Sequence, residues 1–97
     1  MPVVAYADDL MDRSKISAAF PDAGFSRSVG AAEADIVIVD LARYGDRIVE
    51  IRTAHPNARI IAFGSHVDRD TAQTARDAGI DIVVARSEFF RDPRALA

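Results

Sequence analysis

Short apolar runs alternate along this chain with helical stretches, and that alternation most constrains the fold. The clearest run is residues 36–39, which are all Ile or Val and lead into Asp40. Comparable runs occupy residues 3–7, 59–63 and 81–85. β-branched apolar runs favour buried strands, and strands separated by helices favour parallel pairing. The sequence therefore predicts an α/β domain of three layers around a mostly parallel sheet.

The remaining elements follow from weaker patterns. Residues 25–29 alternate apolar and polar side chains and predict a fifth, edge strand. Only residues 30–34 connect it to the next strand, whereas a parallel crossover usually takes about a dozen residues. The second helix is therefore predicted to be reduced or absent. Longer helices are predicted at residues 12–20, 44–54 and 68–78, and a short one around Phe89 and Phe90.

Composition limits the functional classes. The 97 residues predict one domain, 1–97, and the net charge of −3 does not favour nucleic acid or an anionic membrane as a partner. There is no cysteine, which excludes disulfides and thiolate catalysis. No membrane-length apolar run or leader peptide is visible, so a cytoplasmic location is expected. No glycine-rich phosphate loop occurs, which argues against a nucleotide-binding enzyme.

Polar residues follow four of the predicted strands. Because parallel strands end at the same edge of a sheet, we expect these residues to gather there. They are Asp8, Asp9, Asp40, Ser65, His66, Arg86 and Ser87. Mg²⁺ prefers carboxylate oxygens, so Asp8, Asp9 and Asp40 form a candidate metal site. Without a cation these carboxylates would repel one another, and one of their pKa values should rise.

This ordered set resembles the receiver domains of bacterial response regulators. The resemblance implies a flavodoxin-like fold, Mg²⁺ held by Asp8 and Asp9, and Asp40 as acceptor of a phosphoryl group from a histidine kinase. It further implies that Ser65 and Arg86 sense that group.

Some positions depart from the family's pattern. Arg86 stands where the family has Lys, and Ser87 where it has Pro. Because arginine readily pairs with a carboxylate, an Arg86–Asp40 ion pair is predicted. With the second helix reduced, these changes predict an atypical, shortened receiver.

The same residues also allow a purely structural interpretation. Asp8 and Asp9 would cap the first helix, and Asp40 would cap a loop. Ser65 would belong to a turn, and His66 would be a solvated loop histidine. Asp12, in the first turn of the first helix, is expected to be solvated.

Three functions are therefore open. The leading one is a stand-alone receiver-like signalling or protein-interaction module, not an enzyme, phosphorylated on Asp40 with Mg²⁺. The alternative is a pseudo-receiver that binds a protein partner without phosphorylation. The third is a small metal-dependent hydrolase, for which no convincing base or nucleophile besides Asp40 is present.

Overall fold

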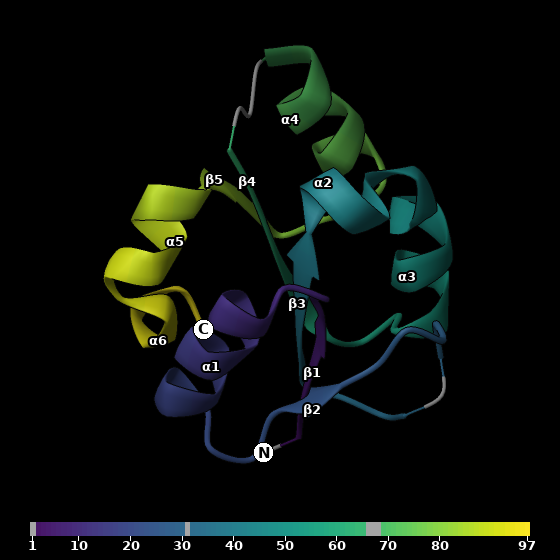
Figure 1. Ribbon diagram of the computed structural model, residues 1–97. Coiled ribbons are helices and arrows are strands. Elements are labelled where there is room, and N and C mark those ends of the chain that lie inside the picture. The colour runs from purple at the N-terminus through teal and green to yellow at the C-terminus, as the bar shows by residue number, and fades with distance from the viewer. Residues whose placement is uncertain (1, 31, 66–68) are drawn as a thin grey trace.

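The computed structural model describes residues 2–30, 32–65 and 69–97. Its centre is an all-parallel, five-stranded sheet in the order β2-β1-β3-β4-β5 (Figure 1). The strands are β1 (Val3–Tyr6), β2 (Gly24–Phe25), β3 (Ile36–Asp40), β4 (Arg59–Gly64) and β5 (Ile82–Ala85). The predicted α/β architecture is confirmed, and β3, the most β-branched strand, lies in the middle of the sheet.

Helices cover both faces of the sheet (Figure 1). One layer contains α1 (Leu10–Ala19), α5 (Arg86–Arg91) and α6 (Pro93–Leu96). The other contains α2 (Leu41–Tyr44), the 3₁₀ helix η1 (Gly45–Arg47), α3 (Ile48–Ala54) and α4 (Arg69–Asp77). Among residues 26–30 and 32–35, the described part of the β2–β3 connection, no helix occurs. The predicted loss of the second helix is confirmed.

Two boundaries differ most from the sequence-based prediction. The edge strand was predicted over residues 25–29 but contains only Gly24–Phe25. The Ser26 hydroxyl donates to the Ser28 carbonyl and accepts from the Ser28 amide, and this local turn competes with strand pairing. The single helix predicted over residues 44–54 is divided into α2, η1 and α3. Helical structure already starts at Leu41, because the Asp40 carboxylate caps α2 immediately after β3.

Each face of the sheet has its own apolar core. Val37, Val39 and Ile60 face the layer of α2, α3 and α4, where Ile48 and Ile51 pack against them. The other face, towards α1, α5 and α6, packs a second cluster built on the side chains of Ile16, Ile38, Ile61, Phe63 and Phe89. The alternation of side chains along each buried strand supplies both cores at once.

Helix α5 anchors this second core. Phe89 is fully buried, and its ring stacks on Phe63 with centroids 4.8 Å apart. Truncating such a side chain to alanine typically costs about 3–5 kcal/mol. Pro93 begins α6 and separates it from α5. In the described part of the chain, no helix is both long and apolar enough to span a membrane.

Candidate functional site

The carboxyl ends of the strands bring three predicted site residues together. Asp8 and Asp9 follow β1, and Asp40 is the last residue of β3. With Ala42 and Arg43 they line a shallow hollow of about 470 Å³. The register places Tyr6 beside Val39, so the ends of these neighbouring strands are level.

Asp8 is bound by side chains from the α2 layer and beyond. Its Oδ1 accepts a 2.6 Å hydrogen bond from the Tyr44 hydroxyl, and its Oδ2 accepts a 2.9 Å bond from Arg43 Nε. Arg27 and Arg13 lie 3.7 Å and 3.8 Å from Oδ1. The Tyr44 hydrogen bond chiefly lowers the pKa of Asp8, with Arg43 and Arg27 adding to it against the effect of burial. Asp8 is therefore ionised and already surrounded by donors.

Asp9 and Asp40 both act as helix caps. Asp9 Oδ2 accepts from the Asp12 amide at 3.0 Å and begins α1. Asp40 Oδ1 accepts from the Ala42 amide at 3.1 Å and begins α2. Asp40 is only 8% exposed, and burial, together with the negative charges of Asp12 and Asp8, raises its pKa. Asp40 therefore resists ionisation more than a solvated aspartate does.

The sequence predicted an ion pair between Arg86 and Asp40, but Arg86 pairs with Asp12. The Arg86 guanidinium, at the start of α5, donates to Asp12 Oδ1. Asp12 is 2% exposed, so the prediction of a solvated first turn was wrong at this residue. The guanidinium also lies 5.4 Å and 5.3 Å from the ring centroids of Phe63 and Phe90. These two rings hold it against α1, where Asp12 is the acid within reach.

The remaining predicted residues fall into a second hollow or outside the described chain. Ser65 is exposed at the end of β4, and together with Arg86 and Ser87 it lines a neighbouring hollow of about 390 Å³. Ser87 was a candidate because it follows β5, and it lies within α5. His66 lies outside the described residues.

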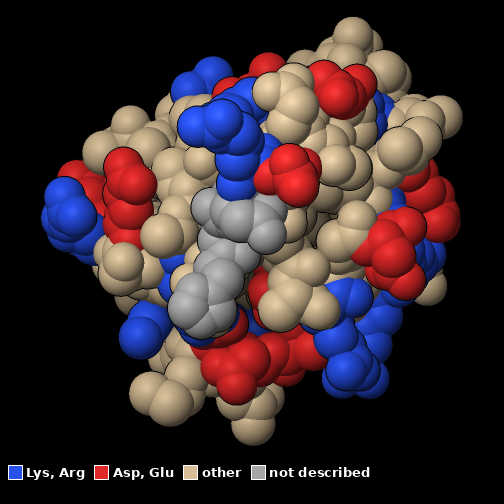
Figure 2. All heavy atoms as spheres, turned by 90° about the horizontal axis from the view of Figure 1, so that it is seen from above, with Lys and Arg blue, Asp and Glu red and all other residues tan. Residues whose placement is uncertain are grey.

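The charges at this edge balance. Its members are four acids and four arginines: Asp8, Asp9, Asp12, Asp40, Arg13, Arg27, Arg43 and Arg86. Seen from above, acidic and basic side chains lie interspersed on this face, without a field of one sign (Figure 2). Among the described residues, no three His, Asp or Glu side chains form a group that could hold a metal ion. Each of the carboxylates instead faces a backbone amide, a hydroxyl or a guanidinium.

Sequence reasoning did not include five contributors to this edge among its site residues: Asp12, Arg13, Arg27, Arg43 and Tyr44. A signal for Asp12 was present, since it lies four residues before Ile16 and therefore on the same, buried face of α1. Tyr44 was assigned to an apolar helix stripe, and its hydroxyl was overlooked although a buried tyrosine usually needs a hydrogen-bond partner.

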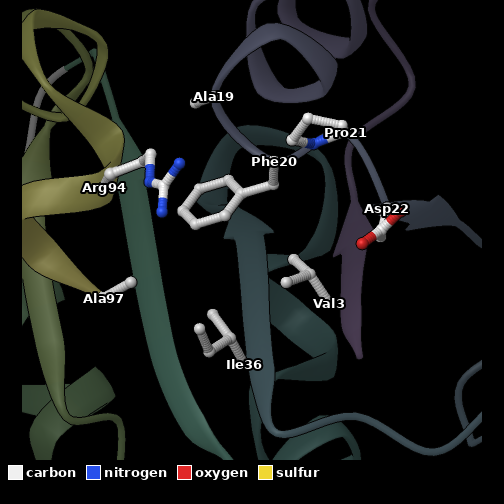
Figure 3. A pocket seen from close by; sticks show the side chains of 8 residues that line it. All are labelled: Val3, Ala19, Phe20, Pro21, Asp22, Ile36, Arg94 and Ala97. Carbon is white, nitrogen blue, oxygen red and sulfur yellow. The ribbon is translucent and has the colours of Figure 1, made fainter. Parts of the chain in front are cut away.

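A separate hollow lies at the opposite end of the sheet. It measures about 410 Å³, and its apolar wall includes Val3, Phe20 and Ile36. Figure 3 shows the Arg94 side chain extending from α6 towards the Phe20 ring. None of the site residues predicted from the sequence lines it.

Comparison with known proteins finds similar folds among solved structures. No protein-family model matches the sequence, and no curated protein matches it. A response regulator from Burkholderia pseudomallei, solved with a phosphorylated aspartic acid, a calcium ion and citrate, superposes with a TM-score of 0.83 at 16% identity. The match covers 98% of this chain and 65% of that one.

Two further solved structures have a similar fold. A response regulator from Thermotoga maritima has a TM-score of 0.76 at 13% identity, covering 98% of this chain and 95% of that one. The Mn²⁺-bound response regulator Rcp1 has a TM-score of 0.72 at 9% identity, covering 93% and 86%. At such identities the likeness concerns the fold. The chain has a shortened receiver fold, and what these proteins bind is a property of those proteins.

Proposed function

We propose that this receiver-fold protein is a signalling module that acts by binding a partner protein and does so without phosphoryl transfer. The observation that supports this most is the surrounding of Asp8: a tyrosine hydroxyl and three arginines take the place where a receiver would need a divalent cation. A pseudo-receiver of this kind would use its strand-end edge as a static network.

The Arg86–Asp12 pair supports the same proposal. A phosphate-sensing cation must be free to move towards the modified aspartate, whereas Arg86 is tied to a buried carboxylate and flanked by two rings. Removing Arg86 would leave the buried Asp12 carboxylate unpaired, which commonly costs about 3 kcal/mol or more. Asp40 would have to ionise fully against burial and neighbouring negative charge, which also works against its use as a nucleophile.

A second candidate function has its own supporting observation. Asp8, Asp9 and Asp40 line one hollow, and a similarly folded protein contains a phosphorylated aspartic acid and a calcium ion. In this version a histidine kinase would phosphorylate Asp40 while Asp8 and Asp9 held Mg²⁺. Arg43 and Arg27 are 70% and 74% exposed, so their ion pairs with Asp8 are screened and could give way to a cation.

Amide NMR distinguishes between the two candidate functions. We expect millimolar Mg²⁺, at constant ionic strength, to leave the amide signals of Asp8, Asp9 and Asp40 in place, and a beryllium fluoride phosphoryl mimic to change nothing further. A saturable shift that spreads to Ser65 and α4 after beryllium fluoride would replace the proposal with the phosphorylation candidate.

A pair of variants sharpens this test. Arg43→Gln removes the nearest guanidinium from Asp8, so it should strengthen any Mg²⁺ response at this carboxylate. Arg76→Gln makes the same change in charge on the exposed surface of α4 and should leave the response as in the unmodified protein. If both variants behave alike, Arg43 does not substitute for a cation.

A further inference from the structure

A second hollow beside the strand-end edge has a chemistry that the network around Asp8 does not use. It lies where α1, the end of β4 and the start of α5 meet, and its volume is about 390 Å³. Its lining residues are Lys15, Ser65, Ala85, Arg86, Ser87 and Phe90. Two of these are cations, two carry hydroxyls and none is acidic, so the hollow presents donors to whatever enters it.

Lys15 supplies a positive charge that pairs with no acidic side chain among the described residues. It is the sole lysine of the sequence and is exposed on α1. Its ammonium lies 5.1 Å from the centroid of the Phe90 ring, and it makes no ion pair with any residue that the structure describes. Contact with a ring face orients the ammonium at the hollow without neutralising it.

Arg86 contributes donors more than charge. Its Nη2 is used by Asp12, which balances the guanidinium, while Nε and Nη1 have no hydrogen bond to the described part of the chain. The hydroxyls of Ser65 and Ser87 add two further groups that can donate. The hollow therefore offers several donors and about one uncompensated positive charge.

We propose that this hollow binds a carboxylate, supplied by an Asp or Glu side chain of the partner protein. Identifying the occupant as a protein rests on the proposed function. A carboxylate brings one negative charge and two acceptor oxygens, which match the charge of Lys15 and the donors beside it. A phosphate dianion would bring a second charge that nothing in the hollow offsets. The Phe90 ring gives the methylene groups of the acidic side chain an apolar wall.

The single lysine makes the test selective. Reductive methylation with ¹³C-formaldehyde labels Lys15 and the N-terminal amine, and it keeps the positive charge of Lys15. The probes are a capped Leu-Glu-Leu peptide, its Leu-Gln-Leu analogue and inorganic phosphate, at constant ionic strength. We expect the Glu peptide to shift the Lys15 methyl signal and the amides of Ser65 and Ser87 saturably. The Gln peptide should bind roughly tenfold more weakly or worse, as expected for the loss of a charge-assisted hydrogen bond.

Substitutions in the unlabelled protein, read from the amides of Ser65 and Ser87, provide the controls. Lys15→Gln changes an exposed side chain, so the fold should persist, and it should weaken Glu-peptide binding about tenfold. Arg76→Gln, on the surface of α4, should leave binding unchanged. Equal binding of the Glu and Gln peptides, an undiminished affinity in Lys15→Gln, or tighter binding of phosphate than of the Glu peptide would each overturn the proposal.

Failure here and failure of the proposed function give different results. A Mg²⁺ and beryllium fluoride response at Asp8 and Asp40 would contradict phosphate-independent signalling while leaving the Lys15 methyl signal free to report carboxylate binding. A silent Lys15 signal with all peptides would remove this site but would not restore phosphorylation of Asp40.

Discussion

At the scale of single residues, Tyr6 and His55 explain how a histidine is kept inside the core. The Tyr6 hydroxyl lies 2.7 Å from His55 Nε2 and accepts a 3.2 Å hydrogen bond from the Gly30 amide. Since the hydroxyl proton is available for Nε2, that nitrogen acts as the acceptor and the imidazole is neutral. Both side chains are at most 4% exposed, so protonating His55 would bury a charge and would require the direction of this hydrogen bond to reverse.

A pH dependence of stability follows. Burial, and secondarily the positive charge of Arg52, lowers the pKa of His55 from 6.5, so the unfolded chain takes up the proton first. Its contribution to stability is present above about pH 6.5 and is lost as the pH falls towards the folded-state pKa. Urea unfolding at pH 5.5 should give a lower free energy of unfolding than at pH 7, by at most about 1.4 kcal/mol for each pH unit below the unfolded-state pKa.

The matched variant is His55→Gln. It should be less stable at pH 7, because the packing against Tyr6 is lost, but it should lack most of the decline between pH 7 and 5.5. An equal decline in both proteins would show that other groups cause it.

The strand-end residues illustrate what a sequence can and cannot predict at this scale. Asp8, Asp9 and Asp40 could be placed at one edge, because strand periodicity and parallel pairing determine where strands end. The partner of Arg86 could not be predicted, because that depends on the rotation of α1 against α5, which no local pattern encodes. Several acids lay within the length of an arginine, and tertiary packing selected Asp12.

At the scale of elements, Gly79 determines how α4 leads into β5. Its φ is +92°, and a Cβ atom there would lie 3.0 Å from Arg52 Cδ. Arg52 in turn donates to the Gly79 carbonyl at 3.0 Å. A residue with a side chain would therefore be strained in its backbone and would displace a side chain that joins α3 to this turn.

We expect Gly79→Ala to destabilise the protein by about 1–2 kcal/mol. Gly45→Ala is the matched control, because Gly45 has φ −61° and open space around its Cα. That substitution should be neutral or slightly stabilising, since alanine restricts the unfolded chain. Urea denaturation of both variants measures the difference. Equal stabilities would mean that the turn at Gly79 relaxes without cost.

Some element boundaries can be predicted from the sequence, and others cannot. Gly79 was a reliable stop signal, because an αL position after a helix favours glycine. The short helix α2, which precedes the helix predicted from residue 44, was not predicted, because Asp40 had been considered as a site residue and its capping of α2 depends on a strand ending directly in a helix. The short β2 was overestimated because alternation alone cannot reveal a competing serine turn.

At the scale of the whole molecule, two helices of the same layer, α3 and α4, are held unequally. Within α4, the buried residues are Ala72 and Ala75, whereas α3 buries Ile48 and Ile51. Alanine side chains bury little apolar area, so α4 has less to lose when it detaches. The small residues at helical spacing in the sequence predict the same weakness.

Hydrogen exchange tests whether α4 is held more weakly than α3. Amides of α4 should exchange at least about tenfold faster than those of α3, and those of β3 should be the slowest. The comparison between the two helices is internal, so it needs no variant. Equal protection of α3 and α4 would show that the layer opens as one unit.

The all-parallel sheet also governs how quickly the chain can reach its native state. Val4 pairs with Gly24 and with Val37, and Ile38 pairs with Ile61, so neighbouring strands are joined by residues distant in sequence. No pairing can begin as a hairpin, and each requires a long loop to close before any contact compensates the lost chain entropy. Refolding should therefore be slower than that of a helical bundle of the same length. During synthesis, β1 can pair with β3, its neighbour towards the centre of the sheet, only after β3 has been made.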